Sequence, residues 1–400
     1  MEAQRPPWIL PVIVLSQFAG TSLWFAGNAV LPELQREWNL PAASLGYITS
    51  AVQSGFICGT LVFAFFAISD RISPRIVFFA CSLLGGLSGL AIFAVAPHFT
   101  GLLVVRFAAG FFLAGIYPVG MKIAAGWYQR GLGSAIGFLV GALVLGTAFP
   151  HLLKGFGHAV SWEAVTLGVC ATAVLGGLAM LWFVPDGPYL AQGTRFDPRA
   201  LALVFRSRDF RASAFGYFGH MWELYAFWAF VPFALAAHSA RTLPSELNVP
   251  FWSFCIIAAG FVGCAAGGRI SLKTGSARVA FVQLCASGLC CVVSPMFFHA
   301  PTPLFLAFLL FWGVVVVGDS PQFSTLNAQN APRALVGSAL TIANCVGFAI
   351  SILSIELLNA LAGEVPTAYL FLPLTFGPIL GLIAMRPLLR PFRALDGVTR

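Results

Sequence analysis

The sequence has 400 residues, of which 59% are hydrophobic and only 9% are charged. A soluble domain carries about 25% charged residues, so this composition excludes a soluble globular protein and indicates a polytopic membrane protein. The formal net charge of +8 would fit a nucleic-acid-binding protein only if the basic residues formed one cluster. They are instead distributed along the chain, mainly in the breaks between long apolar segments.

Runs of about 20 apolar residues, the length that crosses a bilayer as a helix, predict twelve spans. The first run is too long for the core of a signal peptide, so we expect it to remain as a span. The spans cover residues 8–31, 45–68, 76–96, 101–125, 133–153, 163–184, 212–237, 249–268, 278–298, 302–327, 335–360 and 367–387. The longest break separates six spans from six. It predicts an N-terminal six-helix bundle over 1–185, a cytoplasmic linker over 186–211 and a C-terminal six-helix bundle over 212–400.

The lysine and arginine residues distinguish the two sides of the membrane. Only Arg36, Lys154 and Arg241 fall in loops on one side, and Arg106 lies inside the fourth span. The remaining eighteen of the 22 Lys and Arg fall in the loops and tails of the other side. By the positive-inside rule, both termini are predicted to be cytoplasmic, in a multi-pass protein of the cell (inner) membrane.

The two halves repeat at an offset of 200 to 205 residues. The sequence Gly115-Ile-Tyr-Pro118 in the fourth span matches Gly318-Asp-Ser-Pro321 in the tenth, and Gly55–Phe56 matches Gly260–Phe261. Parallel repeats of six spans build one large class of secondary transporters, with the substrate bound between the halves.

The whole chain resembles a major facilitator superfamily transporter. Arg106 followed by Gly110 is similar to the fourth-span motif that this family associates with proton coupling. The resemblance implies an all-α fold of 12 transmembrane helices in two pseudo-symmetric six-helix bundles, with spans one, four, seven and ten around a central cavity. The loop over residues 69–75 is similar to the family's gating loop, although it lacks two of the usual glycines. It implies gating roles for Asp70, Arg71 and Arg75.

Helical spacing places polar and aromatic residues on one stripe of each of these four spans. Four such stripes indicate a solute cavity, although the aromatic residues equally fit packing and the amides equally fit hydrogen bonds between helices. The predicted solute contacts are Gln17, Trp24, Asn28, Tyr117, Phe227, Trp312 and Gln322.

Four ionisable residues inside the spans are predicted to couple transport to protons: Arg106, His220, Glu223 and Asp319. A charge at the centre of a membrane helix costs about 2.5–3.5 kcal/mol on insertion scales, so these residues require a function or a partner. A buried carboxylate that titrates near neutral pH suits a group that gains and loses a proton in each cycle. Two alternatives stay open, namely a structural bond between Glu223 and His220 on one helix face and Arg106 as a static partner of a kinked backbone. Glu356, near the outer end of the eleventh span, fits a residue that faces the lipid headgroups.

These observations predict a secondary active transporter that moves a small organic solute by alternating access and is coupled to protons. The solute is anionic if Arg106 reaches it. The alternatives are a proton-driven efflux pump for amphipathic compounds and, in a different class, a channel or receptor of the same topology. The sequence holds no metal-ligand cluster, HExxH or nucleophile elbow, so we expect no enzyme, no metal and no cofactor. The expected partners are the solute, protons and the lipid bilayer, with no nucleic acid, for a functional monomer.

Overall fold

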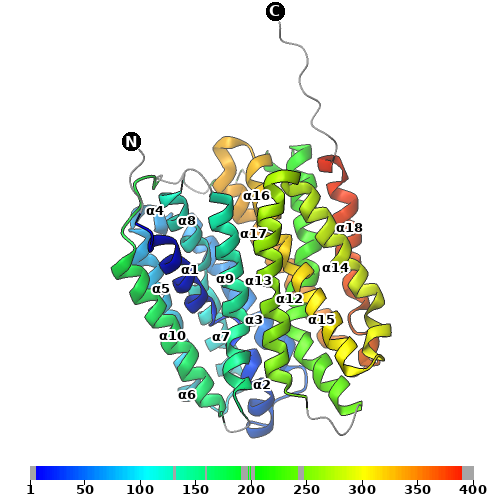
Figure 1. Ribbon diagram of the computed structural model, residues 1–400. Helices are drawn as coiled ribbons and strands as arrows, with labels where there is room; N and C mark the ends of the chain where they lie inside the picture. Colours follow the sequence, from blue (N-terminus) through cyan, green and yellow to red (C-terminus); the bar gives the residue numbers. More distant parts are fainter. Residues whose placement is uncertain are drawn as a thin grey trace, which may run out of the picture.

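The computed structural model describes residues 6–128, 132–157, 160–190, 197, 199, 203–241 and 247–389. The chain forms long α-helices that run up and down the molecule (Figure 1), and no β-strand occurs among these residues. Part of the predicted linker, residues 191–196, 198 and 200–202, lies outside the described residues.

Six helical spans precede residue 186. They are formed by α1 (Ile9–Thr21) with α2 (Ala26–Glu37), α3 (Ser44–Phe65), α5 (Pro74–Leu90) with α6 (Ile92–Val95), α7 (Phe99–Leu113) with α8 (Tyr117–Trp127), α9 (Leu132–Gly155) and α10 (Trp162–Phe183). The short helix α4 (Ile68–Arg71) lies between α3 and α5.

Six more spans follow. They are formed by α12 (Arg208–Arg241), α13 (Val249–Thr274), α14 (Ser276–Phe298), α15 (Thr302–Gly318) with α16 (Ser320–Asn330), α17 (Val336–Leu361) and α18 (Phe376–Met385). The 3-10 helices are η1 (Arg333–Leu335) before α17, η2 (Thr367–Tyr369) and η3 (Leu372–Thr375) before α18, and η4 (Arg386–Leu389) after it.

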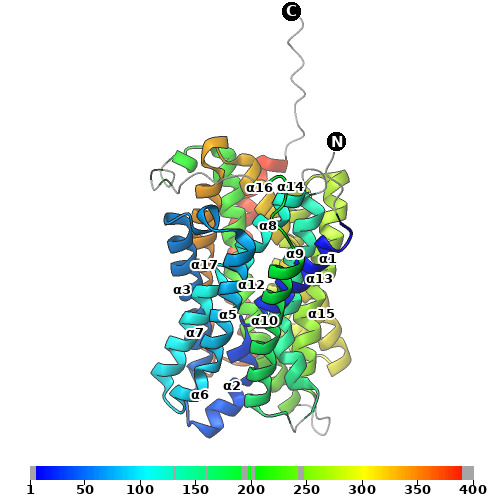
Figure 2. The ribbon, with the colours of Figure 1, turned by 90° about the vertical axis from the view of Figure 1, so that its left-hand side faces the viewer.

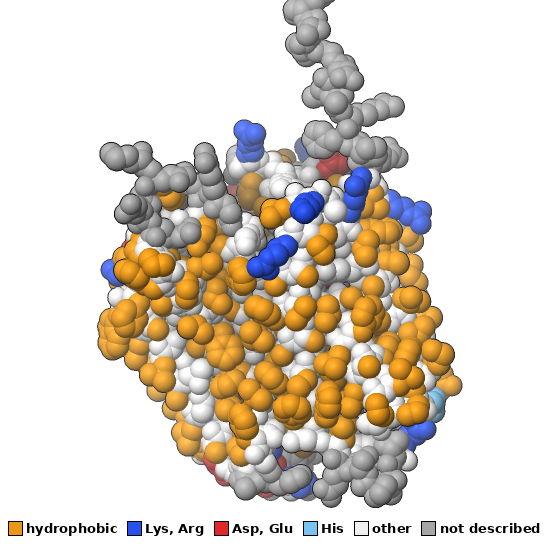
Figure 3. All heavy atoms as spheres, viewed as in Figure 1, with side chains coloured by type: hydrophobic (Ala, Val, Ile, Leu, Met, Phe, Trp, Pro, Cys, Tyr) orange, Lys and Arg blue, Asp and Glu red, His pale blue; other side chains and the backbone are white. Residues whose placement is uncertain are grey.

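Within the described part of the chain, 11 spans are long and apolar enough to cross a membrane. The twelfth is α12, a helix of 34 residues whose polar side chains lower its hydropathy. The prediction of twelve membrane helices in two six-helix bundles is therefore confirmed. The two bundles lie side by side in Figure 1. Figure 2 shows the first bundle from the side that faces away from the second. On the face shown in Figure 3, hydrophobic side chains form a broad band across the middle, and Lys and Arg gather above it. We call this basic end the inner side and the opposite end the outer side.

The two halves share a close backbone contact at equivalent glycines. A Cβ on Gly110 of α7 would lie 2.0 Å from the carbonyl oxygen of Val52 on α3. A Cβ on Gly313 of α15 would lie 2.0 Å from the carbonyl oxygen of Ile256 on α13. Only glycine allows two helices to approach this closely, so the sequence repeat is also a repeat of packing.

Spans four and ten are both interrupted at the repeated Gly-x-x-Pro sequence. α7 stops at Leu113 and α8 starts at Tyr117, while α15 stops at Gly318 and α16 starts at Ser320. Proline at the second position of each new helix explains the restart, because it removes a donor that has no partner there.

The first span also breaks, which the sequence did not predict. α1 ends at Thr21 and α2 begins at Ala26, without a proline between them. The span also continues to Glu37, past the predicted end at residue 31, with Pro32 inside α2. The matching span of the second half, α12, is continuous.

Candidate functional site

A cavity lies between the two halves, near the middle of the molecule. Its polar lining comes from Tyr117, Tyr217, Tyr225, Ser320, Ser324 and Asn344. Its apolar lining comes from Met121, Val140, Leu143, Met221, Leu224, Val317 and Phe348. The cavity measures about 30 Å³, which is room for about two water molecules. A small organic solute therefore enters only when the halves separate further.

A layer of aromatic side chains closes this cavity on its outer side. The Trp24 ring stacks on Tyr225 at 5.7 Å between ring centroids and on Phe348 at 5.5 Å, and it lies 4.9 Å from Phe56. Trp24 and Phe56 belong to the first half and the other two to the second, and all four are buried. The aromatic layer therefore joins the two halves.

Arg106 holds the backbone that carries Trp24. Its guanidinium donates hydrogen bonds to the carbonyl oxygens of Leu23 (3.1 Å) and Trp24, both in the break between α1 and α2. The guanidinium also packs on Gly27, where a Cβ would lie 2.9 Å from Nε. Arg106 is 4% exposed, and no ion pair joins it to a carboxylate of the described residues. It thus binds the broken backbone of the first span and lies outside the cavity lining, and its predicted role in proton coupling stays a prediction.

Four residues join the outer ends of α3 and α17, and we call them the outer latch: Gly46, Ser50, Glu356 and Asn359. The Gly46 N–H donates to Asn359 Oδ1 (3.2 Å), and Asn359 Nδ2 donates to the carbonyl oxygen of Ala43 (3.1 Å). The Ser50 hydroxyl donates to Glu356 Oε1 (2.5 Å). Glu356 therefore bonds to the other half, whereas the sequence placed it among the lipid headgroups.

Asn359→Ala is expected to release the outer side. The variant loses two hydrogen bonds between the halves, each worth about 0.5–1.5 kcal/mol net, so the outward-open state should gain about tenfold in population. Gly46→Ala should act alike, because its Cβ would lie 2.4 Å from Asn359 Cγ. The measurement is the distance between spin labels at the exposed Ala164 and Glu364. An unchanged distance distribution in both variants would contradict a latch.

The Glu223 carboxylate lies inside the second half. Its Oε1 accepts hydrogen bonds from the Ser287 hydroxyl, from Trp312 Nε1 (2.7 Å) and from the Cys291 thiol (3.4 Å). Glu223 is 1% exposed and forms no ion pair with any described residue. Its donors come from α14 and α15, so the carboxylate faces away from the cavity and into the C-terminal bundle.

His220 pairs with Asp319 and not with Glu223. Its Nδ1 lies 2.9 Å from Asp319 Oδ1, and both side chains are 1% exposed. Neither Asp319 Oδ2 nor His220 Nε2 has a hydrogen-bond partner among the described residues. Asp319 also occupies the N-cap position of α16, without a side-chain capping hydrogen bond, and the helix dipole favours negative charge at this end. The bond between Glu223 and His220 that the sequence offered as an alternative is therefore wrong.

Of the predicted solute contacts, only Tyr117 lines the cavity in this state. Trp24 lies in the aromatic layer, Asn28 Nδ2 donates to Thr49 Oγ1 (2.8 Å), and Phe227 packs on Trp312 at 4.5 Å. Gln322 is buried, and the buried Gln17 amide has no hydrogen-bond partner among the described residues. The solute roles of these six residues stay predictions for a more open state.

The predicted gating loop binds its own half. Asp70 Oδ1 accepts from Lys122 Nζ of α8 at 2.5 Å, and Lys122 also donates to the Ser69 carbonyl oxygen (2.7 Å). Arg71 is exposed and Arg75 is partly buried. Lys122 was not among the predicted site residues, because a lysine near the inner end of a span fits a residue that extends to the membrane interface.

Asp70→Asn is expected to slow turnover while expression and solute binding stay normal. The Asp70–Lys122 pair is partly exposed, with side chains 20% and 23% accessible, so its loss should cost less than about 1 kcal/mol of stability. The measurement is the initial rate of solute exchange in proteoliposomes. Lys122→Gln is the matched variant, because it removes the same ion pair from the other partner. Unchanged exchange rates in both variants would contradict a gating role for the pair.

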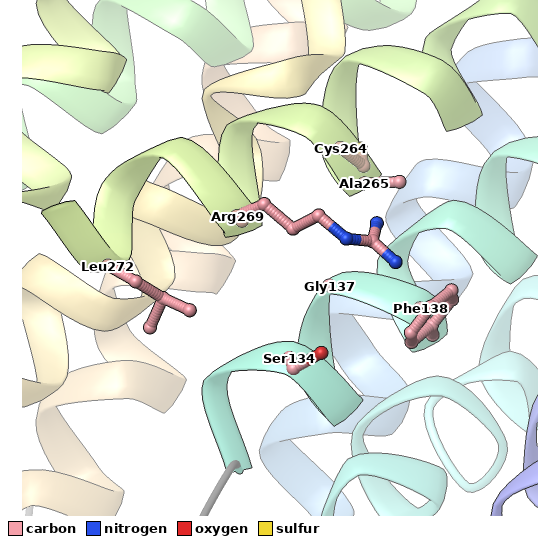
Figure 4. A pocket seen from close by; sticks show the side chains of 8 residues that line it. Ser134, Gly137, Phe138, Cys264, Ala265, Arg269 and Leu272 are labelled. Atoms are coloured by element: carbon pink, nitrogen blue, oxygen red, sulfur yellow. The ribbon is translucent and has the colours of Figure 1, made fainter.

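A second pocket lies between α9 and α13 (Figure 4). Ser134, Gly137 and Phe138 line it from α9, and Cys264 and Arg269 from α13. The Arg269 guanidinium extends toward α9 and lies 5.8 Å from the centre of the Phe138 ring. This pocket is therefore a positively charged site, unlike the central cavity.

Known proteins resemble the chain in sequence profile and in fold. Residues 13–355 match the profile of the Major Facilitator Superfamily. The crystal structure of the human organic anion transporter MFSD10 (TETRAN) superposes with a TM-score of 0.67 at 16% identity, covering 96% of this chain and 100% of that chain. The E. coli fucose:proton symporter FucP superposes with a TM-score of 0.66 at 14% identity, covering 95% and 99%. Identities this low show a shared fold alone. No curated protein sequence matches the chain.

Proposed function

The chain belongs to the Major Facilitator Superfamily of membrane transporters, and we propose that it moves a small organic solute by alternating access, driven by protons. Members of this family carry small solutes across membranes and are not enzymes.

The contacts between the halves support alternating access. The aromatic layer and the outer latch hold the outer side together, and Asn248 Nδ2 adds a bond to the carbonyl oxygen of Gly155 at the outer ends of α13 and α9. The cavity lies on the inner side of the aromatic layer, lined by Met121 and Ser324 from the inner segments of spans four and ten. Breaking the outer contacts while closing the inner ends would expose the same cavity to the other side.

The single observation that carries proton coupling is the position of Glu223. It lies near the middle of α12 and is buried, with hydrogen-bond donors but no cationic partner among the residues that the structure describes. An ionised carboxylate is costly in such a place unless a cation pairs with it. When the surroundings alternate between water and protein, this carboxyl group can therefore release and bind a proton in step with the cycle.

His220 and Asp319 offer a route between the cavity and Glu223. Ser320, next to Asp319, and Tyr217 line the cavity, and the Tyr217 ring lies 6.0 Å from the His220 ring. His220 and Glu223 are three residues apart on α12, which places their Cβ atoms about 5–6 Å apart. We infer that protons pass from the cavity through this pair to Glu223.

The same proposal includes the orientation. The basic inner side would face the cytoplasm of a cell whose inner membrane holds the protein, with both termini and the linker 186–211 on that side, and the functional unit would be a monomer. Proteolysis of the linker in right-side-out and inverted vesicles tests this orientation.

A second candidate is proton-driven export of an amphipathic compound. Met121, Met221 and Phe348 in the cavity wall favour it, because methionine and aromatic side chains adapt to varied apolar shapes. The direction of the pH gradient separates the two candidates. A symporter accumulates solute on the side toward which protons flow, and an antiporter accumulates it on the side from which they flow.

The test uses a solute identified by stabilisation of the purified protein in a compound screen. Proteoliposomes with an imposed pH gradient should accumulate this solute, and the internal pH should change as the solute enters. Equal uptake with and without the gradient would contradict proton coupling. A steady current that does not saturate with solute would indicate a channel.

A further inference from the structure

We propose that the central cavity takes an uncharged organic solute that presents hydrogen-bonding groups on a mainly apolar body. This inference rests on the proposed transport function and names the substrate class of the same site. It departs from the anionic solute that Arg106 implied from the sequence, and it follows from where the charges lie relative to the cavity wall.

Among the described residues, no charged side chain is part of the cavity wall, whose polar members are tyrosine, serine and asparagine. The ionisable groups nearby lie behind that wall, and each is bound by at least one partner. Arg106 is bound to two backbone carbonyls in the first half. In the second half His220 and Asp319 pair with each other, and Glu223 is held by three donors.

A charged solute in this cavity would lose its hydration without gaining a counter-ion. Such burial of an unpaired charge is strongly unfavourable. Transporters and enzymes that select anions or cations place a guanidinium or a carboxylate where the solute can touch it. Here the buried charges are 4% exposed or less, so they are available for coupling and not for contact with a solute.

The polar groups of the wall are available to a solute. Among the described residues, no hydrogen bond uses the hydroxyls of Tyr117, Tyr225, Ser320 or Ser324. Asn344 accepts one from the Tyr217 hydroxyl (3.3 Å) through Oδ1, which leaves its NH₂ group free. Hydroxyls both donate and accept, so the wall matches neutral partners such as alcohol, amide or ether groups.

The apolar groups of the wall define the rest of the solute. Met121 and Leu143 come from the first half, and Met221, Leu224 and Phe348 from the second. Apolar side chains from both halves favour an apolar or aromatic body between them, while the hydroxyls fix its orientation.

The experiment measures the charge of the cavity without needing the solute. Ser324→Cys and Ser320→Cys are each treated with neutral methyl methanethiosulfonate and with its anionic ethylsulfonate and cationic ethyltrimethylammonium analogues. Mass spectrometry gives the rate at each site. The intrinsic reactivity of the thiol affects both rates equally, so the ratio of the anionic to the cationic rate depends on the charge around the site. The same ratio measured for 2-mercaptoethanol in solution is the reference. Ser320→Cys is the harsher test because it adjoins Asp319.

Ser134→Cys is the matched control, because its pocket contains the Arg269 guanidinium (Figure 4). A unit charge in a pocket should shift the ratio by about tenfold or more, and here it should favour the anion. At both cavity sites we expect the ratio to stay near the reference and the neutral reagent to react.

A shift as large as that of the control at both cavity sites would overturn the inference, and so would a failure of the neutral reagent to react at either. These outcomes do not depend on transport. If pH-driven accumulation is absent while the cavity sites give the reference ratio, the proposed function fails and the neutral character of the cavity stands.

Discussion

Glu223→Gln should abolish solute accumulation driven by a pH gradient while leaving exchange intact. One pH unit corresponds to about 1.4 kcal/mol per proton, so the wild-type protein should reach about tenfold accumulation with one proton per solute, and the variant should reach none. Glutamine keeps the shape of the protonated carboxyl group and still accepts hydrogen bonds from Ser287 and Trp312, so the helices α12, α14 and α15 should stay packed. Proteoliposome uptake under the gradient, compared with counterflow at equal pH, measures the two activities separately.

Glu364→Gln is the control for this experiment, because Glu364 is an exposed carboxylate outside the long helices. It should retain both activities. Should Glu223→Gln still accumulate solute, the coupling proton binds elsewhere and the Glu223 carboxylate serves only to join α12 to its neighbours. Loss of counterflow as well would indicate a packing defect.

Arg106→Lys should abolish accumulation and counterflow together. Lysine lacks the planar fork that bonds two carbonyl groups at once, so at least one of the Leu23 and Trp24 carbonyls loses its partner in a buried place, at about 1–3 kcal/mol. The break between α1 and α2 should then change shape and displace Trp24 from the aromatic layer. Counterflow and thermal unfolding measure the two consequences.

Arg36→Lys is its matched control. Arg36, like Arg106, donates to a backbone carbonyl. Its acceptor is Pro32 in its own helix (3.2 Å), and the bond is exposed to solvent. It should therefore tolerate lysine. A fully active Arg106→Lys would show that a positive charge alone is sufficient there, and the proposed link from Arg106 to Trp24 would be abandoned.

The sequence predicted the spans because their composition is dictated by lipid. Each helix must present apolar side chains over about 20 residues, and this pattern survives whatever the helices pack against. The interruptions of spans four and ten fall at Pro118 and Pro321, each of which removes a helix hydrogen bond, but proline alone does not mark them, since α12 runs unbroken through Pro232.

The orientation of α12 could not be predicted. His220, Glu223 and Phe227 do share a face, but the residues around them are buried on every side, so the periodicity does not tell which face meets the cavity. The structure turns Tyr217, Met221 and Tyr225 to the cavity instead. A helix that is surrounded by protein lacks the contrast between a polar and an apolar face from which its orientation could be predicted.

The partners of Arg106 and the outer latch were hidden for other reasons. Arg106 binds backbone carbonyls, which every residue has, so no sequence pattern marks them. The latch joins Gly46 to Asn359, which lie far apart in the chain, and only the packing of α3 against α17 brings them together.

The most direct test of the central claim measures protonation of Glu223 itself. Infrared difference spectra of the purified protein between acidic and neutral pH should contain a protonated-carboxyl band that is lost in Glu223→Gln and kept in Glu356→Gln, the carboxylate of the outer latch. A spectrum of Glu223→Gln in which that band remains unchanged would show that Glu223 does not exchange a proton, and the account of coupling would be wrong.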